Sequence, residues 1–261
     1  MRTCLFCQAK LTKSNRSKEH TVPRWIVRRL RCEDDVYLSK TLTYPNVPNE
    51  VLAQRTQAIT SLVLGNVCTN CNNGWMSQLE TDTAPLLGAL WKQTSPTILT
   101  PAQCLTLARW TFKTAATISY SSDYKKIIPI QHIHDFGTTQ RLPENSSVDM
   151  AYCANGDRLI QCLQGGNKRF AVRDPNVTEV ILKDSYVMTL HFHHVMFRLA
   201  WSPVNGVRAQ PIPKQAVFRV FPPSDEDLLV QLVRVFRDHF QFHFVSTVLA
   251  EDGLLGDLPG D

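Results

Sequence analysis

Two pairs of cysteines with the same spacing constrain this chain more than any other sequence feature. Cys4 and Cys7 form one CxxC pair, and Cys68 and Cys71 form a second pair after a gap of 60 residues. A CxxC turn directs both sulfurs toward one ion, and four thiolates suit tetrahedral zinc. The alternative is four reduced cysteines that never meet. We expect a structural Zn²⁺ held by both pairs, which the fold must then bring together.

The composition is that of a globular protein. The chain has 261 residues, of which 43% are hydrophobic and 20% are charged, so we expect one large domain or two modest ones. The sequence contains no run of 18 apolar residues, so it predicts no membrane-spanning helix. The first ten residues, MRTCLFCQAK, lack the apolar core of a signal peptide, so a cytoplasmic location with reduced thiols is expected. The other four cysteines (Cys32, Cys104, Cys153 and Cys162) are interpreted as small buried hydrophobic residues.

The positive charge is concentrated near the start of the chain. Residues 1–60 carry 11 Lys and Arg against 5 Asp and Glu, a net charge of +6, whereas residues 61–261 carry 17 against 18. A localised basic region is typical of proteins that bind polyanions such as nucleic acids. It is also compatible with an ordinary solvated surface.

Residue patterns predict helices and strands in the first half of the chain. Thr100-Pro101 with Gln103 is a helix start, and we expect that helix to reach about Ser119. The other expected elements are a basic helix over 24–31, a polar insertion or flexible loop over 33–57, a strand over 58–67 and a helix over 75–91 with a kink or a restart at Pro85.

The second half predicts more strands. Asn155-Gly156 is a strong hairpin signal between strands 149–153 and 158–163. Further strands are expected over 177–182 and 216–221, and the run 186–201 predicts either a bent strand or two strands. Ser224 with the acids that follow it predicts a helix start. His132 and His134 are assigned to a loop, and His191, His193 and His194 to packing or solvent.

A third pattern lies between and after the cysteine pairs. Glu19-His20 is followed by Pro23, and Asn72 directly follows the second pair. In this order the residues resemble the HNH family of ββα-metal nucleases, in the subset with two CxxC pairs, and the resemblance covers residues 1–90. It implies an α+β fold, with a small zinc-stapled ββα-metal (HNH-like) N-terminal module over 1–95. A larger α+β body over 96–250 and an acidic tail over 251–261 would follow.

The resemblance also implies roles for individual residues. His20 would be the general base, and Glu19 and Asn72 would bind a catalytic Mg²⁺ or Mn²⁺. These residue types suit phosphodiester hydrolysis, because imidazole titrates near neutral pH and carboxylate and amide oxygens are hard ligands. Adjacent residues of a strand point to opposite faces, so Glu19 and His20 share one site only if the chain turns there.

One position departs from the family pattern. Many HNH proteins have a middle Asn nine residues before the final Asn or His, where this chain has Val63. The nearest candidate is Asn66, three residues out of register. That Asn typically orients the loop carrying the catalytic His.

These features predict a metal-dependent endonuclease that hydrolyses DNA, with RNA as an open alternative. Lys18, Arg24 and Arg28 are expected to contact phosphates. The setting would be bacterial or phage defence or mobile-element biology, with the C-terminal part mediating homo-oligomerisation or binding a regulatory protein. Two alternatives stay open: a catalytically inactive zinc-stapled module that binds nucleic acid or protein, and a structural or inhibitory protein that acts through its C-terminal part.

Overall fold

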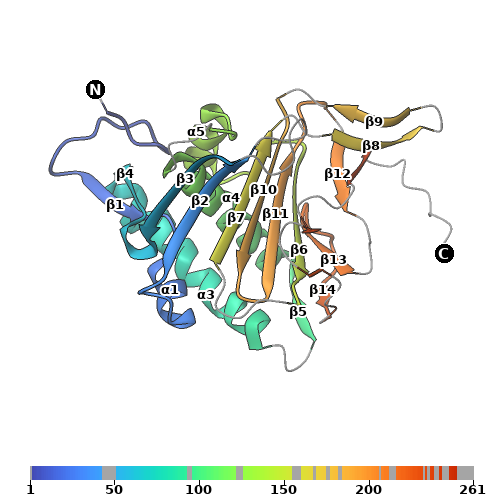
Figure 1. The fold of residues 1–261 in the computed structure, drawn as a ribbon, viewed down its shortest axis with the longest axis horizontal. Helices are drawn as coiled ribbons and strands as arrows, with labels where there is room; N and C mark the ends of the chain where they lie inside the picture. Colours follow the sequence, from blue (N-terminus) through green and yellow to red (C-terminus); the bar gives the residue numbers. More distant parts are fainter. Residues whose placement is uncertain are drawn as a thin grey trace.

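The computed structural model describes residues 2–42, 51–92, 96–121, 126–154, 160–166, 169–174, 177–181, 184–205, 207–211, 216–231, 233, 236–237, 241–242 and 247–251. The fold is a mixture of helices and several sheets (Figure 1). The α-helices of the described part are α1 (Arg24–Leu30), α2 (Thr69–Cys71), α3 (Ser77–Lys92), α4 (Pro101–Ser121) and α5 (Ile130–Thr139). A 3₁₀ turn, η1 (Ile59–Ser61), precedes β4, and a π-helical turn, η2 (Asn72–Met76), joins α2 to α3.

The strands of the described residues form five separate sheets. An antiparallel five-stranded sheet has the order β13 (Val217–Phe221), β6 (Ser146–Tyr152), β11 (Val195–Trp201), β10 (Tyr186–Phe192) and β7 (Ile160–Gly166). A four-stranded sheet has the order β12 (Val207–Pro211), β15 (Thr247–Glu251), β8 (Arg169–Asp174) and β9 (Val177–Ile181). The two-stranded sheets are β1 (Arg16–His20) with β4 (Val63–Cys68), β2 (Val36–Leu42) with β3 (Val51–Ala58), and β5 (Thr97–Leu99) with β14 (Leu228–Val230).

The five-stranded sheet is the centre of the fold. Its inner strands β6 and β10 are buried along their whole length, so neither face of these strands meets solvent. Helix α4 contacts β10, β11 and β13 on one face. Phe236 and Phe242 pack in a second cluster with Ala151 and Met196 from β6 and β11. The sheet therefore lies between a helical layer and a C-terminal segment.

Helix α4 begins as the sequence predicts. The backbone N–H of Gln103 donates to Thr100 Oγ1 at 3.3 Å, and the Gln103 side chain accepts from the Thr100 N–H at 2.9 Å. This reciprocal capping box satisfies two N–H groups that have no partner within the helix. Residues 111–117 of α4 are all buried, because the helix packs against α3 as well as the sheet.

Strands β1 and β4 form a short antiparallel ribbon that leads into the helical layer. Arg16 is paired with Cys68 and His20 with Val63, with a register shift between Ser17 and Glu19. β4 runs directly into α2, η2 and α3 (Figure 1). Helix α1 and the β2–β3 hairpin are inserted between the two strands of the ribbon.

Several local predictions are wrong. Strands β6 and β7 do not pair with each other, because the β10–β11 hairpin lies between them in the sheet. The expected turn at Asn155-Gly156 lies outside the described residues. The segment 33–57, predicted as an insertion or flexible loop, contains β2 and most of β3. The strand expected over 58–67 is divided by the turn η1, and β4 begins only at Val63.

Two further predictions are wrong in the C-terminal part. Leu228–Val230, expected in a helix after Ser224, forms strand β14 on β5, with Leu229 exposed and Val230 buried as strand alternation requires. His132 and His134 lie in helix α5 and not in a loop. The predicted run 186–201 is two strands, and the helices expected at 24–31 and 75–91 are present as α1 and α3.

One cluster of buried residues spans most of the described chain. It contains Cys4 and Leu64 from the N-terminal part together with Phe112 and Phe197 from the second part. The boundary predicted near residue 95 stays a prediction. In the described part of the chain, no helix is both long enough and apolar enough to cross a membrane.

Candidate functional site

The four paired cysteines come together in the structure. Cys4 and Cys7 lie in the N-terminal loop, Cys68 ends β4 and Cys71 lies in α2. The sulfurs of Cys4 and Cys71 are 3.9 Å apart, those of Cys7 and Cys68 are 3.6 Å apart, and all four lie within 4.8 Å of one another. A Zn–S bond of about 2.3 Å in a tetrahedron requires sulfurs about 3.8 Å apart. The cluster could therefore bind a metal such as zinc.

The local electrostatics of the cluster also suit a cation. The hydrogen bond between Cys4 and Cys71 lowers the pKa of Cys4 to about 4, whereas the same contact and burial raise the pKa of Cys71. Burial also raises the pKa of Cys7. The pKa of one thiol is therefore low, while the pKa values of two neighbouring thiols are raised. A divalent cation would lower those raised pKa values, because its charge stabilises the thiolates.

Backbone N–H groups donate hydrogen bonds to two of the four sulfurs, which stabilises negative charge on them. The N–H of Cys68 donates to Cys4 Sγ at 3.3 Å, and the N–H of Cys71 donates to Cys68 Sγ at 3.4 Å. Phe6 lies between the first two cysteines and packs edge-on against Trp75, with ring centroids 5.2 Å apart. The first cysteine turn is thus anchored to the segment that follows the second one.

Strand β1 directs Glu19 and His20 to different surroundings. Glu19 is paired with buried Leu64 and contacts Lys113 of α4, so it faces the helical layer. His20 is paired with Val63, which is 38% exposed, and directly opposed residues of an antiparallel pair lie on the same face. His20 thus belongs to the outer face of the ribbon, and no turn brings the two side chains to one face.

His20 has the electrostatic character of a base. Burial lowers its pKa, and nearby Arg24 lowers it further against the opposing effect of Glu19. The imidazole is therefore neutral at physiological pH and has a lone pair that can accept a proton.

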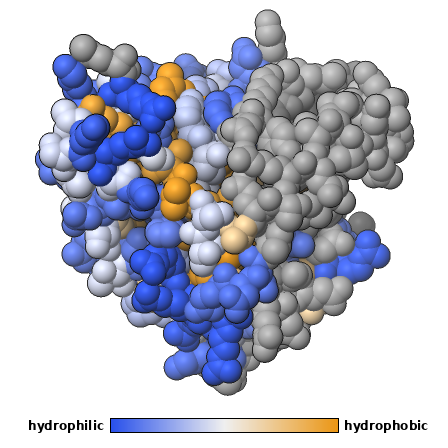
Figure 2. Space-filling model, turned by 60° about the vertical axis from the view of Figure 1, so that its left-hand side comes forward, coloured by the Kyte–Doolittle hydropathy of each residue, from blue (hydrophilic) through white to orange (hydrophobic). Residues whose placement is uncertain are grey.

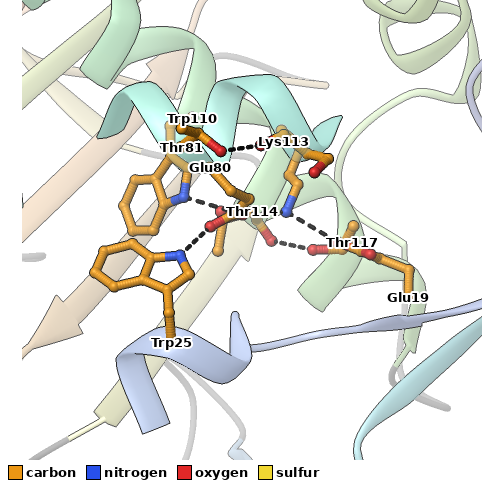
Figure 3. Close-up of polar contacts among 9 residues, drawn as sticks. Glu19, Trp25, Glu80, Thr81, Trp110, Lys113, Thr114 and Thr117 are labelled. Atoms are coloured by element: carbon orange, nitrogen blue, oxygen red, sulfur yellow. Dashed lines mark hydrogen bonds and ion pairs between the residues drawn. The ribbon is translucent and has the colours of Figure 1, made fainter. Parts of the chain in front are cut away.

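Glu19 belongs to a buried charge network that the sequence did not predict (Figure 3). Lys113 Nζ lies 2.9 Å from Glu19 Oε1 and 2.5 Å from Glu80 Oε1. The side chain of Lys113 is 1% exposed and that of Glu19 is 13% exposed. Burial lowers the pKa of Lys113, but Glu80 and Glu19 outweigh that effect and raise it, so the amine stays charged.

Two indole groups complete the surroundings of Glu80. Figure 3 shows the indole nitrogens of Trp25 and Trp110 directed at the same carboxylate. Trp110 Nε1 donates to Glu80 Oε1 at 3.2 Å, and Trp25 Nε1 donates to Glu80 Oε2. The network joins β1, α1, α3 and α4. It carries two carboxylates against one ammonium, and Glu19 is its member nearest the ribbon.

Asn72 is not brought next to Glu19 by the register of the ribbon. Arg16 is the partner of Cys68, which lies near Asn72 in the chain. Glu19 lies three residues after Arg16 along β1, so the backbones of these two residues are about 10 Å apart. Asn72 follows the cysteine cluster and is half-buried. Helix α3 brings Glu80 toward Glu19 instead. Joint coordination of one ion by Glu19 and Asn72 stays a prediction.

The predicted phosphate-binding residues lie on the surface. Lys18 on β1 and Arg24 and Arg28 on α1 are exposed, while Ile26 and Val27 of the same helix face the core. Figure 2 shows that, where this face is coloured, most residues are hydrophilic, with a narrow apolar strip among them. A basic, hydrophilic surface is compatible with a polyanion partner.

Lys113 and Glu80 were missed, although each leaves a signal in the sequence. Lys113 is the single charged residue in the run 110–121, where the other residues are apolar or small and polar, or Tyr. Glu80 lies four residues after Met76 and seven before Leu87, on the apolar face of α3. A charge on an apolar helix face requires a partner, but spacing alone does not identify that partner.

Comparison of this chain with family models, with curated proteins and with solved structures finds no match.

Proposed function

We propose that this protein is a metal-dependent HNH-like endonuclease that hydrolyses phosphodiester bonds of DNA. The observation that carries the proposal is His20, a neutral, half-buried imidazole at the end of a strand whose antiparallel partner continues through a four-cysteine cluster into a helix. This strand–strand–helix order agrees with the family resemblance of residues 1–90. In this role the His20 imidazole takes a proton from the attacking water.

The proposal includes a structural Zn²⁺ at the four cysteines and Mg²⁺ or Mn²⁺ as the catalytic ion. Glu19 suits a cation ligand in part, because ligating carboxylates are usually held by a second partner, here Lys113. The excess negative charge of the network also favours a cation beside Glu19. A divalent ion there would polarise the phosphate and stabilise the leaving oxygen. Asn72 is the second proposed ligand.

Cleavage of plasmid DNA with Mg²⁺ or Mn²⁺ tests the proposal. We expect wild type to cut and His20→Ala to lose a factor of roughly 10²–10⁴ in rate, as removal of a general base typically costs. His134→Ala, the same change at a half-buried histidine in α5, is the matched control and should cut like wild type. All three proteins must first contain equal zinc. Equal cutting by wild type and His20→Ala would contradict the proposed role.

The second candidate is a zinc-stapled module that binds nucleic acid or protein without cutting. Three observations favour it. Val63 occupies the usual position of the middle Asn, and Glu19 Oε1 is held by Lys113 rather than open. Glu19 and His20 also belong to opposite faces of β1. Salt-dependent DNA binding without cleavage of any DNA or RNA would support this candidate over the nuclease.

A further inference from the structure

We propose that a groove beside β4 binds backbone phosphates of a nucleic-acid strand through Arg16 and Arg2. The inference rests on the proposed function for the identity of the ligand. Among the described strands β4 pairs only with β1, and the N–H of Leu5 donates to the carbonyl oxygen of Asn66 at 2.7 Å. Val63, Leu64, Gly65 and Asn66 line the groove. The groove has a volume of about 460 Å³, and its remaining lining residues are Arg2, Thr3, Arg16, Tyr120 and Ser121.

The charge of the groove is positive. Arg2 and Arg16 are both exposed, and none of the lining residues is acidic. The ammonium group of Lys126 lies 5.7 Å from the ring centroid of Tyr120, which adds a third cation beside the groove. Arginine guanidinium groups match phosphate oxygens in a planar, two-bond geometry.

Arg16 is held in an orientation that suits a ligand. Its Nε donates to the carbonyl oxygen of Gly65, so the side chain lies across β4. A Cβ at Gly65 would lie 2.5 Å from Arg16 Nη2, so the absence of a side chain at Gly65 gives the guanidinium its place. To the described residues Arg16 makes no further side-chain hydrogen bond or ion pair. Its terminal N–H groups can therefore serve a ligand.

Asn66, which also lines the groove, carries a further polar group. Asn66 Oδ1 is buried and has no hydrogen-bond partner among the described residues. Because Oδ1 and phosphate oxygens both accept hydrogen bonds, a water bound to the phosphate could donate to Oδ1 and bridge the two groups.

The groove is continuous with the surroundings of His20. Val63 lies directly opposite His20 across the ribbon and also lines the groove. Arg16 and Lys18 are exposed on the same strand as His20, while Ser17 and Glu19 between them are half-buried. This exposure alternates along β1 through the register shift between Ser17 and Glu19. A strand of nucleic acid in the groove would therefore pass from Arg16 toward the proposed base. This continuity favours phosphates over the carboxylates of an acidic protein.

Fluorescence anisotropy with a short labelled DNA duplex and the matching single strand tests the groove. The full chain is used in a His20→Ala background, so that binding is read without cleavage. We expect Arg16→Gln and Arg2→Gln each to raise Kd on the order of tenfold and to reduce the salt slope by about one. Arg141→Gln, at an exposed arginine that does not line the groove, should leave both quantities unchanged.

A variant that keeps the charge separates position from net charge. Gly65→Ala should displace the guanidinium of Arg16 and weaken binding as Arg16→Gln does. Equal zinc content in all variants verifies that they are folded. Wild-type Kd and salt slope in both arginine variants would overturn the inference.

Competition identifies the source of the ligand charge. If inorganic phosphate displaces the DNA when both are present at the same concentration of phosphate groups, the groove is a site for small anions. If polyglutamate binds more tightly than DNA and this binding depends on Arg16, the partner is an acidic protein. Either result overturns the nucleic-acid assignment. If the wild-type chain binds DNA through these arginines but never cuts it, the groove is supported and the nuclease is rejected. If the chain cuts DNA and the arginine variants bind as tightly as wild type, the nuclease is supported and the groove is rejected.

Discussion

Lys113 is the residue on which the buried charge of the N-terminal part depends. Among the described residues it is the one cation in contact with both Glu19 and Glu80, and its side chain is almost fully buried. Lys113→Met would leave two carboxylates close together without compensation. Breaking a buried ion pair in this way typically costs about 3–5 kcal/mol of unfolding free energy.

Urea denaturation measures this cost. Lys92→Met, at an exposed position at the end of α3, is the control and should change stability by less than about 0.5 kcal/mol. Adding Glu80→Gln to Lys113→Met should recover part of the loss, because it removes one of the two uncompensated charges. Similar stability of Lys113→Met and Lys92→Met would show that the network contributes nothing.

His132 gives the molecule a predictable response to acid. Its Nδ1 lies 3.2 Å from the hydroxyl of Tyr186, and its ring packs against Trp201 with centroids 4.6 Å apart. Burial lowers the pKa of His132, against the opposing charge of Asp135. Because the pKa of His132 in the folded state lies below the unfolded value of about 6.5, the neutral imidazole stabilises the fold above that pH. This contribution to the free energy of unfolding is lost as the pH falls through the folded pKa.

We therefore expect His132→Phe to lose less stability than wild type on acidification from neutral pH. Urea midpoints of both proteins across this range measure the difference. At pH 8 the imidazole is neutral in both states, so that point supplies the reference for packing effects. Parallel stability curves for the two proteins would be evidence against this contribution.

At the scale of elements, helix α5 fixes the first cysteine turn. A Cβ at Gly137 would lie 2.4 Å from the backbone oxygen of Phe6, between Cys4 and Cys7. Gly→Ala inside a helix usually stabilises by about 1 kcal/mol, but here the contact is with backbone that cannot rotate away. We expect Gly137→Ala to destabilise the protein by about 1–3 kcal/mol and to weaken zinc retention.

Thermal melting and the zinc content after mild chelation check this prediction. Gly88→Ala in α3 is the control, because its added Cβ would meet only the end of the Arg29 side chain, at 3.4 Å. It should be neutral or stabilising. A Gly137→Ala protein that melts above wild type would show that α5 does not press on the cysteine turn.

At the scale of the whole molecule, the N-terminal part and the rest share one core. Trp91 Nε1 donates to the carbonyl oxygen of Phe192 at 3.1 Å, and the hydroxyl of Tyr152 donates to the carbonyl oxygen of Leu90 at 3.5 Å. A fragment of residues 1–95 would expose Trp91 and the buried leucines of α3. We expect this fragment not to fold by itself, even with zinc.

Circular dichroism of the fragment during heating measures its folding. The full chain, which should unfold together with zinc release in one transition, is the reference. Cooperative melting of the isolated fragment would instead support two independent domains divided near residue 95.

Local patterns in the sequence were enough to predict several features. The four-cysteine cluster was predicted from spacing alone, because CxxC turns direct sulfurs to a common point and thiolates favour one metal. The start of α4 was predicted from Thr100 and Gln103, because a capping box is formed by neighbours in the chain. The mixture of helices and sheets also followed from local patterns, and the HNH-like arrangement stays a proposal.

Tertiary structure decided the partners that local patterns cannot specify. The placement of β6 and β7 on either side of the β10–β11 hairpin, and of Leu228–Val230 on β5, depends on which distant strands share a core. The pairing of Lys113 with Glu19, 94 residues away, has the same origin. The sequence determined which groups need a metal, a cap or a counter-charge. Long-range packing alone decided which side chain supplies each one, because residues far apart in the chain meet only when the whole core forms.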